Sequence, residues 1–167
     1  MLLVLALGLS KCISLDQAQR SLDGRVILAI GASISLSIAI QNTGLADMLV
    51  QKLLLVGGDN PYLNLLLLYI MTVIATELIT NNAAAILMFP LAEIMSASLN
   101  ASLLPFAIII MFGASSSFIT PMGYQTNLMV QGAGGYSVLD FFKVGIGLSL
   151  LVGVMVISIV PVVWPFF

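Results

Sequence analysis

Charged side chains are too rare in this chain to cover a surface that faces water. Its 167 residues include five Lys and Arg, seven Asp and Glu and no His, so charged types make up only 7%. A soluble domain carries roughly a quarter charged residues. Hydrophobic types make up 60% of the sequence, and long apolar stretches cross a bilayer as helices. We therefore expect an all-α integral membrane protein.

The same composition excludes several classes of function. With no His and a single cysteine, Cys12, the chain lacks the residues for Ser-His-Asp or Cys-His catalysis, a zinc cluster or an internal disulfide. Five scattered basic residues and a net charge of −2 argue against a nucleic-acid partner. We do not expect an enzyme, because Glu77 is the only deep ionisable group and it has no evident catalytic partner in the sequence.

The first residues are apolar but too few to cross a bilayer. Met1 to Leu9 is a run of nine residues with no basic residue before it. A helical span needs about twenty residues, and a signal peptide needs a positive start and a small-residue cleavage site. We therefore expect residues 1–10 to be the end of a helix and the chain to be a fragment.

Basic residues set the expected orientation. Lys11, Arg20 and Arg25 lie in the polar stretch 11–25, and short loops rich in Lys and Arg stay in the cytoplasm. Residues 26–42 then form a transmembrane segment. Counting the later segments forward predicts an outside C-terminus in a multi-pass protein of the cell inner (cytoplasmic) membrane.

Two segments of different character follow. Residues 45–56 place apolar side chains on one helical face, which is typical of a helix in the membrane interface. Residues 61–98 are apolar on both sides of Thr80, Asn81 and Asn82. They form either two spans joined by a tight turn or a re-entrant helical hairpin whose tip is this polar sequence. We favour the hairpin, because the tip has no Lys or Arg and each arm is short.

Helix-breaking residues interrupt the rest of the chain. The sequence is apolar from residue 103 until Thr120 and Pro121, and a stretch rich in Gly, Gln, Thr and Asn follows. We interpret residues 103–148 as one broken transmembrane helix, with its second piece starting near residue 137, and residues 149–167 as a last transmembrane segment. Breaks of this kind point to substrate or ion sites in transporters.

Neutral polar groups gather at the hairpin tip. Thr76, Thr80, Asn81 and Asn82 lie within seven residues, and a polar group in hydrocarbon costs free energy unless it finds partners. Asn and Thr oxygens with freed backbone carbonyls suit Na⁺, whereas amide and hydroxyl donors near a helix N-terminus suit an anion. The alternative for any single threonine is hydrogen bonding between helices. The cluster as a whole predicts a cation-coupled anion carrier.

Two neighbouring features keep alternative roles. An intramembrane carboxylate such as Glu77 is a functional candidate by default. It is either a proton-coupling group or a side chain held by backbone hydrogen bonds of the hairpin, and we favour the structural role. Ser115 to Ser117 either allow close approach of helices or contribute to the site.

Two motifs make the sequence recognisable. Thr76 to Ala83 reads Thr-Glu-Leu-Ile-Thr-Asn-Asn-Ala, and the run from Thr120 to Val130 begins with Thr-Pro and continues with Gly-Tyr-Gln-Thr-Asn-Leu-Met-Val. They resemble the second Ser-Asn-Thr hairpin motif and the Thr-Pro loop of the divalent anion/sodium symporter family, in the form found in sulfate or dicarboxylate permeases of the ion transporter superfamily. The resemblance covers nearly the whole chain but only the C-terminal half of a family member. Thr80 stands at the motif's Ser, and Asn82 stands at its Thr.

The resemblance implies the residues of a site. Sodium would be bound by the side chains of Thr76 and Asn81 and by the backbone of Ile79 and Ile119. The anion would contact the hairpin tip and the Thr-Pro turn, namely Asn81, Asn82, Thr120 and Pro121. No cofactor is implied, and Na⁺ is the coupling ion.

The resemblance also implies a fold and an activity. The chain would be the C-terminal inverted repeat of an ion-transporter-type fold, and the activity would be sodium-coupled secondary transport of a small divalent anion, sulfate or dicarboxylate. The partners would be the lipid bilayer and the missing N-terminal repeat, within a homodimer of the complete protein. One alternative is a related carrier of arsenite, citrate or Na⁺/H⁺ exchange. The other is an inert truncated product or non-transporting membrane subunit.

Overall fold

The computed structural model describes residues 31, 35, 38, 39 and 42–167. The chain divides after Ile34 into two units, and the fold described below is that of the second. The expectations for residues 1–10 and 11–25 lie outside the described residues, as do those for nearly all of 26–42.

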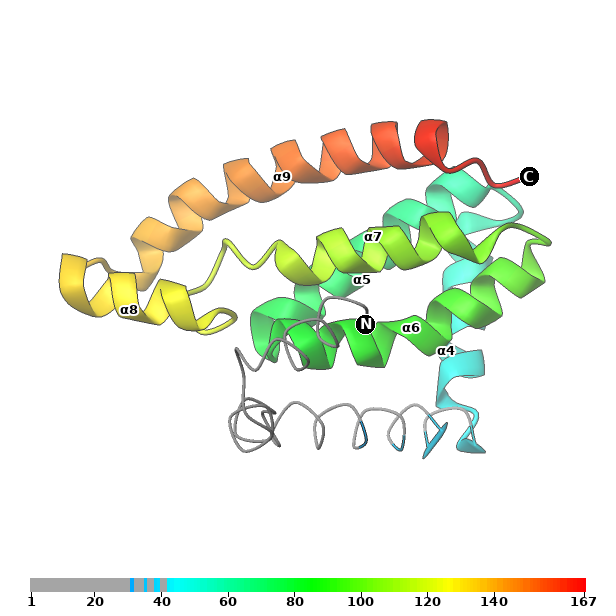
Figure 1. The fold of residues 1–167 in the computed structure, drawn as a ribbon, viewed down its shortest axis with the longest axis horizontal. Helices are drawn as coiled ribbons and strands as arrows, with labels where there is room; N and C mark the ends of the chain where they lie inside the picture. The colour runs from blue at the N-terminus through cyan, green and yellow to red at the C-terminus, as the bar shows by residue number, and fades with distance from the viewer. Residues whose placement is uncertain (1–30, 32–34, 36–37, 40–41) are drawn as a thin grey trace, which may run out of the picture. The chain divides into compact units, whose positions relative to one another are not determined.

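The described part of the second unit is helical and contains no strand. The helices, drawn in Figure 1, are α4 (Leu45–Gly57), α5 (Pro61–Leu78), α6 (Asn81–Ser98), α7 (Leu103–Ser115), α8 (Gln125–Gly134) and α9 (Val138–Val163). By length and composition, α5 and α9 are long and apolar enough to cross a membrane. The expectation of an all-α chain with apolar candidate spans is therefore confirmed for these residues.

A polar turn joins α4 to α5. Gly58 ends α4 with a φ of 53°, a backbone conformation that favours glycine. Asn60 then caps α5, because its side-chain oxygen accepts hydrogen bonds from the backbone N–H groups of Tyr62 at 3.0 Å and Leu63 at 3.4 Å. Pro61 occupies the first helical position, where the missing N–H costs nothing. These residues fix where α5 begins.

The turn between α5 and α6 is very short. Helix α5 ends at Leu78, and Ile79 and Thr80 are extended. The hydroxyl of Thr80 caps α6 by accepting from the N–H of Ala83 at 3.4 Å. A hydroxyl is favoured at this position, so Thr keeps the capping role of a Ser.

Helices α5, α6 and α7 pack against one another and form the core. Helix α4 contacts α5 and α6, and α9 contacts α5 and α7. Small residues allow this close packing: a Cβ on Gly113 of α7 would lie 3.0 Å from the side chain of Thr72, and one on Gly153 of α9 would lie 2.9 Å from the ring of Tyr69. The largest fully buried apolar side chains are Leu65, Leu68, Leu91, Met95, Phe106, Ile109, Val50 and Val160.

The broken helix differs from the expected arrangement in two ways. The chain is non-helical between Ser115 and Gln125, but α8 then forms within the Gly- and Gln-rich stretch that was expected to be a loop. After Gly135, α9 continues without interruption through the point between residues 148 and 149 where we expected one segment to end. The residues around that point are apolar or small, and α9 contains no proline before Pro161, so nothing stops the helix there.

Candidate functional site

The C-terminal end of α5, the start of α6 and the non-helical segment after α7 meet at one place. Hydrogen bonds from Thr76 to Ala114 and from residues 119 and 120 to Glu77 join α5 to the end of α7 and the segment after it, about forty positions away in the sequence. Asn81, at the start of α6, contacts Thr76. Each of the three elements ends or begins here, so backbone groups that lack a helical partner collect at this point.

The amide of Asn81 faces three oxygen atoms. With its nitrogen turned toward them, it donates to the carbonyls of Gly123 at 3.1 Å and Ala114 at 3.3 Å and to the Thr76 hydroxyl at 2.9 Å. The Thr76 hydroxyl itself donates to the Ala114 carbonyl at 2.6 Å. The Thr76 side chain is completely buried. If the amide turns over, its oxygen faces the other three oxygen atoms. The Thr76 hydroxyl is then the only hydrogen-bond donor among these four neutral oxygens.

The Glu77 carboxylate binds the Thr-Pro turn. Its Oε1 accepts from the N–H of Ile119 at 2.9 Å, and its Oε2 accepts from the N–H and the hydroxyl of Thr120, both at 2.7 Å. The sequence interpretation favoured backbone hydrogen bonds from the hairpin itself. The structure instead gives Glu77 partners in the segment after α7.

Glycine and serine allow the two segments to approach closely. A Cβ on Gly123 would lie 2.6 Å from the Thr76 carbonyl oxygen and would also collide with the Ser117 hydroxyl. That hydroxyl is buried and has no hydrogen-bond partner in the described part of the chain. Ser116 donates to the carbonyl of Phe112 at 2.7 Å. Of the three serines, Ser117 is therefore the one aimed at the site.

Asn127 is a functional candidate that sequence reasoning did not single out. It lies in the first turn of α8, and its side-chain amide donates to the carbonyls of Ser117 at 2.9 Å and Thr120 at 3.3 Å. The only available signal was its position within the Thr-Pro run. Nothing in the sequence indicates that the Asn127 amide hydrogen-bonds to backbone carbonyls that precede it.

The other predicted residues lie around this centre. Asn82 is exposed at the start of α6, and Pro121 is buried directly after Thr120. The N–H of Ile79 donates to Ala75 within α5, and that of Ile119 donates to Glu77. The structure thus brings Thr76 together with Asn81, and Glu77 together with Ile119 and Thr120, while Asn82 forms no hydrogen bond that links it to them.

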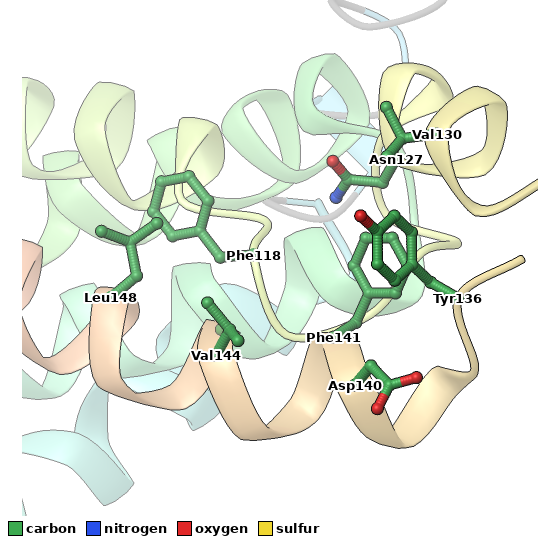
Figure 2. Close-up of a pocket in the computed structure, with 9 residues that line it drawn as sticks. Phe118, Asn127, Val130, Tyr136, Asp140, Phe141, Val144 and Leu148 are labelled. Carbon is green, nitrogen blue, oxygen red and sulfur yellow. The ribbon is translucent and has the colours of Figure 1, made fainter. Parts of the chain in front are cut away.

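A separate cavity of about 400 Å³ lies between α8, α9 and the segment before Thr120. Figure 2 shows that its walls are mainly aromatic and aliphatic, with the Asn127 amide on one side. An apolar lining of this kind does not suit a small divalent anion. Its lining residues are Phe118, Asn127, Val130, Tyr136, Asp140, Phe141, Val144, Gly145 and Leu148.

In comparisons with known proteins, the chain is similar to transporters. Residues 1–166 match the family described as citrate transporter. The chain is 40% identical over 141 residues to the "Probable sodium/sulfate cotransporter 3" of Chlamydomonas reinhardtii, covering 82% of the chain and 16% of that protein. It is 26% identical over 144 residues to the sodium-dependent dicarboxylate transporter SdcS of Staphylococcus saprophyticus, covering 86% and 28%. It is also 31% identical over 163 residues to the uncharacterized transporter YfbS of Escherichia coli, covering 97% and 27%. The chain therefore spans less than a third of the length of these relatives.

Proposed function

The chain belongs to the citrate transporter family, and from this premise we propose that the full-length protein carries a small divalent anion across a membrane together with Na⁺. The family assignment confirms the resemblance to divalent anion/sodium symporters that the two motifs indicated. Relatives with similar sequences are named for sodium with sulfate and for sodium with dicarboxylates. Sulfate and dicarboxylates are accordingly the anions that we propose, and the family description adds citrate as a substrate to test.

The observation that carries the proposal is the set of oxygens around Asn81. The Ala114 and Gly123 carbonyls and the Thr76 hydroxyl all lie within hydrogen-bond distance of one amide atom of Asn81, and the Thr76 hydroxyl also bonds the Ala114 carbonyl. Hard, neutral oxygens are suitable ligands for a hard cation. One turn of the amide changes its role: with nitrogen inward it satisfies the carbonyls without an ion, and with oxygen inward it completes a cation site. We propose that Na⁺ binding accompanies this change.

The family motif adds two backbone groups to the proposed sodium site, those of Ile79 and Ile119. Ile79 follows the end of α5 and Ile119 lies in the non-helical segment after α7. Both use their N–H groups elsewhere, in bonds to Ala75 and to Glu77. Carbonyl oxygens beside an interrupted helix are the groups that coordinate Na⁺ in transporters with broken helices. Thr76, Asn81, Ile79 and Ile119 are therefore the sodium ligands that we propose.

We propose that the anion binds at the start of α6 and beside the Thr-Pro turn. Asn81 and Asn82 begin α6, where N–H groups point outward and the helix dipole favours negative charge. The exposed amide of Asn82 adds a donor that is not committed to Asn81 or Thr76. Thr120 and Pro121 complete the proposed anion site from the opposite segment.

The transport cycle would follow from these two adjacent sites. Na⁺ binding orders the tip between α5 and α6, which raises the affinity for the anion, and by reciprocity the anion raises the affinity for Na⁺. In this proposal α5 and α6 form a re-entrant hairpin in an inner-membrane protein, and an N-terminal inverted repeat supplies the other half of the site. The complete carrier is a homodimer that works by alternating access.

Asn81→Ala tests the proposed site. We expect the variant of the full-length protein to be expressed normally and to lose Na⁺-dependent uptake in proteoliposomes, because the substitution removes both the ligand and the carbonyl partner. Asn100→Gly is the matched control, since Asn100 is an exposed asparagine with a φ of 49°, which glycine adopts freely. Uptake by Asn81→Ala equal to that of the control would contradict the site assignment.

Competition separates the substrates. Unlabelled sulfate, succinate, citrate and arsenite are added in turn to uptake assays of labelled sulfate. Competition by sulfate or succinate supports the proposed anion class. Competition by citrate alone would favour the related carrier, and uptake without any Na⁺ dependence would contradict sodium coupling.

A further inference from the structure

We propose that Glu77 is the positioning residue that holds the Thr-Pro turn at the hairpin tip, and that through this turn it sets the affinity for Na⁺. The inference rests on the proposed function and deepens it, because it assigns a role in the same site to a residue outside the sodium and anion ligands. Its basis is the geometry of three hydrogen bonds between two separate elements.

The Glu77 carboxylate occupies the place that an anion would take at this turn. Two consecutive backbone N–H groups, at Ile119 and Thr120, and the Thr120 hydroxyl all point at it over 2.7–2.9 Å. Consecutive N–H groups in a non-helical turn form a natural anion-binding concavity. Hydrogen bonds to a charged acceptor are about twice as strong as neutral ones. The turn therefore donates three hydrogen bonds to a single side chain.

This contact changes what Thr120 can do. Its N–H and its hydroxyl both donate to Glu77, so neither donor is free for the transported anion while the contact lasts. Thr120 therefore contributes to the proposed anion site by placing Pro121, and its hydrogen bonds to Glu77 fix the position of the segment that carries the proposed sodium ligand Ile119.

Glu77 also links the turn directly to a sodium ligand. Glu77 directly follows Thr76 on α5. The Thr76 hydroxyl contacts Asn81 and the Ala114 carbonyl. Ile119, the other residue held by Glu77, is itself a proposed backbone ligand. One side chain thus fixes the spacing between the proposed ligands of α5 and those of the opposite segment. Loss of the contact should weaken Na⁺ binding without removing any ligand.

A double-mutant cycle on the full-length protein in proteoliposomes tests the inference. Glu77→Gln keeps the size of the side chain but places an amide nitrogen, itself a donor, against donors. We expect it to raise the Na⁺ concentration for half-maximal sulfate uptake by about tenfold, with maximal uptake largely recovered at saturating Na⁺. Thr120→Val should raise it less, because the backbone donors remain. In the Glu77→Gln background, Thr120→Val should add almost nothing, because the shared contact is already lost.

Conservative and matched variants complete this test. Glu77→Asp retains the charge on a shorter side chain, and we expect an intermediate rise in half-saturating Na⁺. Asp59→Asn makes the same change of charge at an exposed position between α4 and α5 and should leave uptake unchanged. Additive effects of the two site substitutions would overturn the inference. An unchanged Na⁺ dependence of uptake in Glu77→Gln would also overturn it. A Glu77→Gln effect seen only as a shifted pH profile of uptake would overturn it as well, because Glu77 would then be a proton carrier.

A labelling experiment tests the positioning role of Glu77 without a transport assay. In a background with Cys12→Ser and no other cysteine, Ser117→Cys places a thiol at a position that is only 3% exposed, and Met122→Cys places one at a position 76% exposed. We expect Glu77→Gln to speed maleimide labelling at position 117 several-fold and to leave that at position 122 unchanged. Equal labelling at 117 with Glu and with Gln would overturn the positioning role. A wild-type protein without Na⁺-dependent uptake would contradict the proposed function instead, and this labelling result would still decide the role of Glu77.

Discussion

Two buried threonines on α5 show how much a single hydroxyl depends on its partner. Thr72 and Thr76 lie about one helical turn apart, and neither side chain is exposed. The Thr72 hydroxyl donates to Leu68 in its own helix at 2.7 Å. The Thr76 hydroxyl crosses to Ala114 on α7 and also contacts Asn81. The Thr72 hydroxyl therefore bonds only within α5, whereas the Thr76 hydroxyl links α5 to α6 and α7.

Replacing each threonine by valine, which has nearly the same shape, separates the two roles. We expect Thr76→Val to lower the stability of the protein by about 1–3 kcal/mol, because it leaves the Ala114 carbonyl and the Asn81 amide short of a buried partner. It should also weaken Na⁺-dependent uptake. Thr72→Val should do neither, since Leu68 remains in the helix ladder. Thermal melting in detergent and Na⁺ titration of uptake provide the measurements, and equal effects of the two substitutions would contradict the assignment of Thr76.

At the scale of residues, the sequence indicated polar side chains, and the resemblance added the backbone of Ile79 and Ile119, but neither indicated the carbonyls of Ala114 and Gly123. Thr76, Glu77 and Asn81 stand out because polar groups in an apolar stretch need a reason. Ala114 and Gly123 contribute through their carbonyls, and a carbonyl leaves no mark in the sequence. Asn127 has a side-chain signal, but its partners are carbonyls of the non-helical segment, which only the folded backbone identifies.

At the scale of elements, capping residues mark where α5, α6 and α7 begin in the structure. Asn60-Pro61 starts α5, Thr80 starts α6 and Ser102 starts α7, and each of them bonds an N–H of the first helical turn. The boundary expected after residue 148 had no such signal. A separate helix α8 was missed because its mixture of Gly, Gln and Asn is also typical of a loop, and its φ-positive terminator, Gly135, is visible only once the helix is known.

Helix α9 supports the broken segment through one glycine. A Cβ on Gly145 would lie 2.6 Å from the carbonyl carbon of Phe118 and 2.8 Å from the Cα of Ile119. Gly147, on the same helix, has no atom within 4 Å of its Cβ position. The two glycines thus differ in whether a methyl group would meet the backbone that leads into the Thr-Pro turn.

We expect Gly145→Ala to displace the segment before Thr120 and so to reduce both Na⁺-dependent uptake and melting temperature, because the obstacle is backbone and cannot rotate away. Gly147→Ala should leave uptake unchanged and stabilise α9 by up to about 1 kcal/mol, since alanine is the better helix former. Uptake assays and melting curves on the two variants make the comparison. A Gly145→Ala protein that behaves like Gly147→Ala would show that the turn does not rest on α9.

At the scale of the whole molecule, we propose an orientation in the bilayer from the distribution of basic residues. Lys11, Arg20 and Arg25 lie in one short stretch of sequence, and such stretches are retained on the cytoplasmic side. Lys52 and Lys143 are the remaining basic residues, on α4 and in the first turns of α9. With the first stretch inside, the segment count places Lys143 inside as well and leaves only Lys52 outside.

Cysteine labelling of intact cells checks this orientation. In a full-length protein with Cys12→Ser and no other cysteine, Asp59→Cys marks the exposed turn between α4 and α5, and Lys143→Cys marks the start of α9. We expect a membrane-impermeant maleimide to label position 59 on intact cells and position 143 only after permeabilisation, because the α5–α6 hairpin returns the chain to its starting side and one crossing along α7 and the non-helical segment follows. A permeant maleimide that labels both positions is the control for folding and access. Labelling of position 143 on intact cells, with position 59 protected, would reverse the orientation and place four of the five basic residues outside, against the charge rule from which the topology was derived.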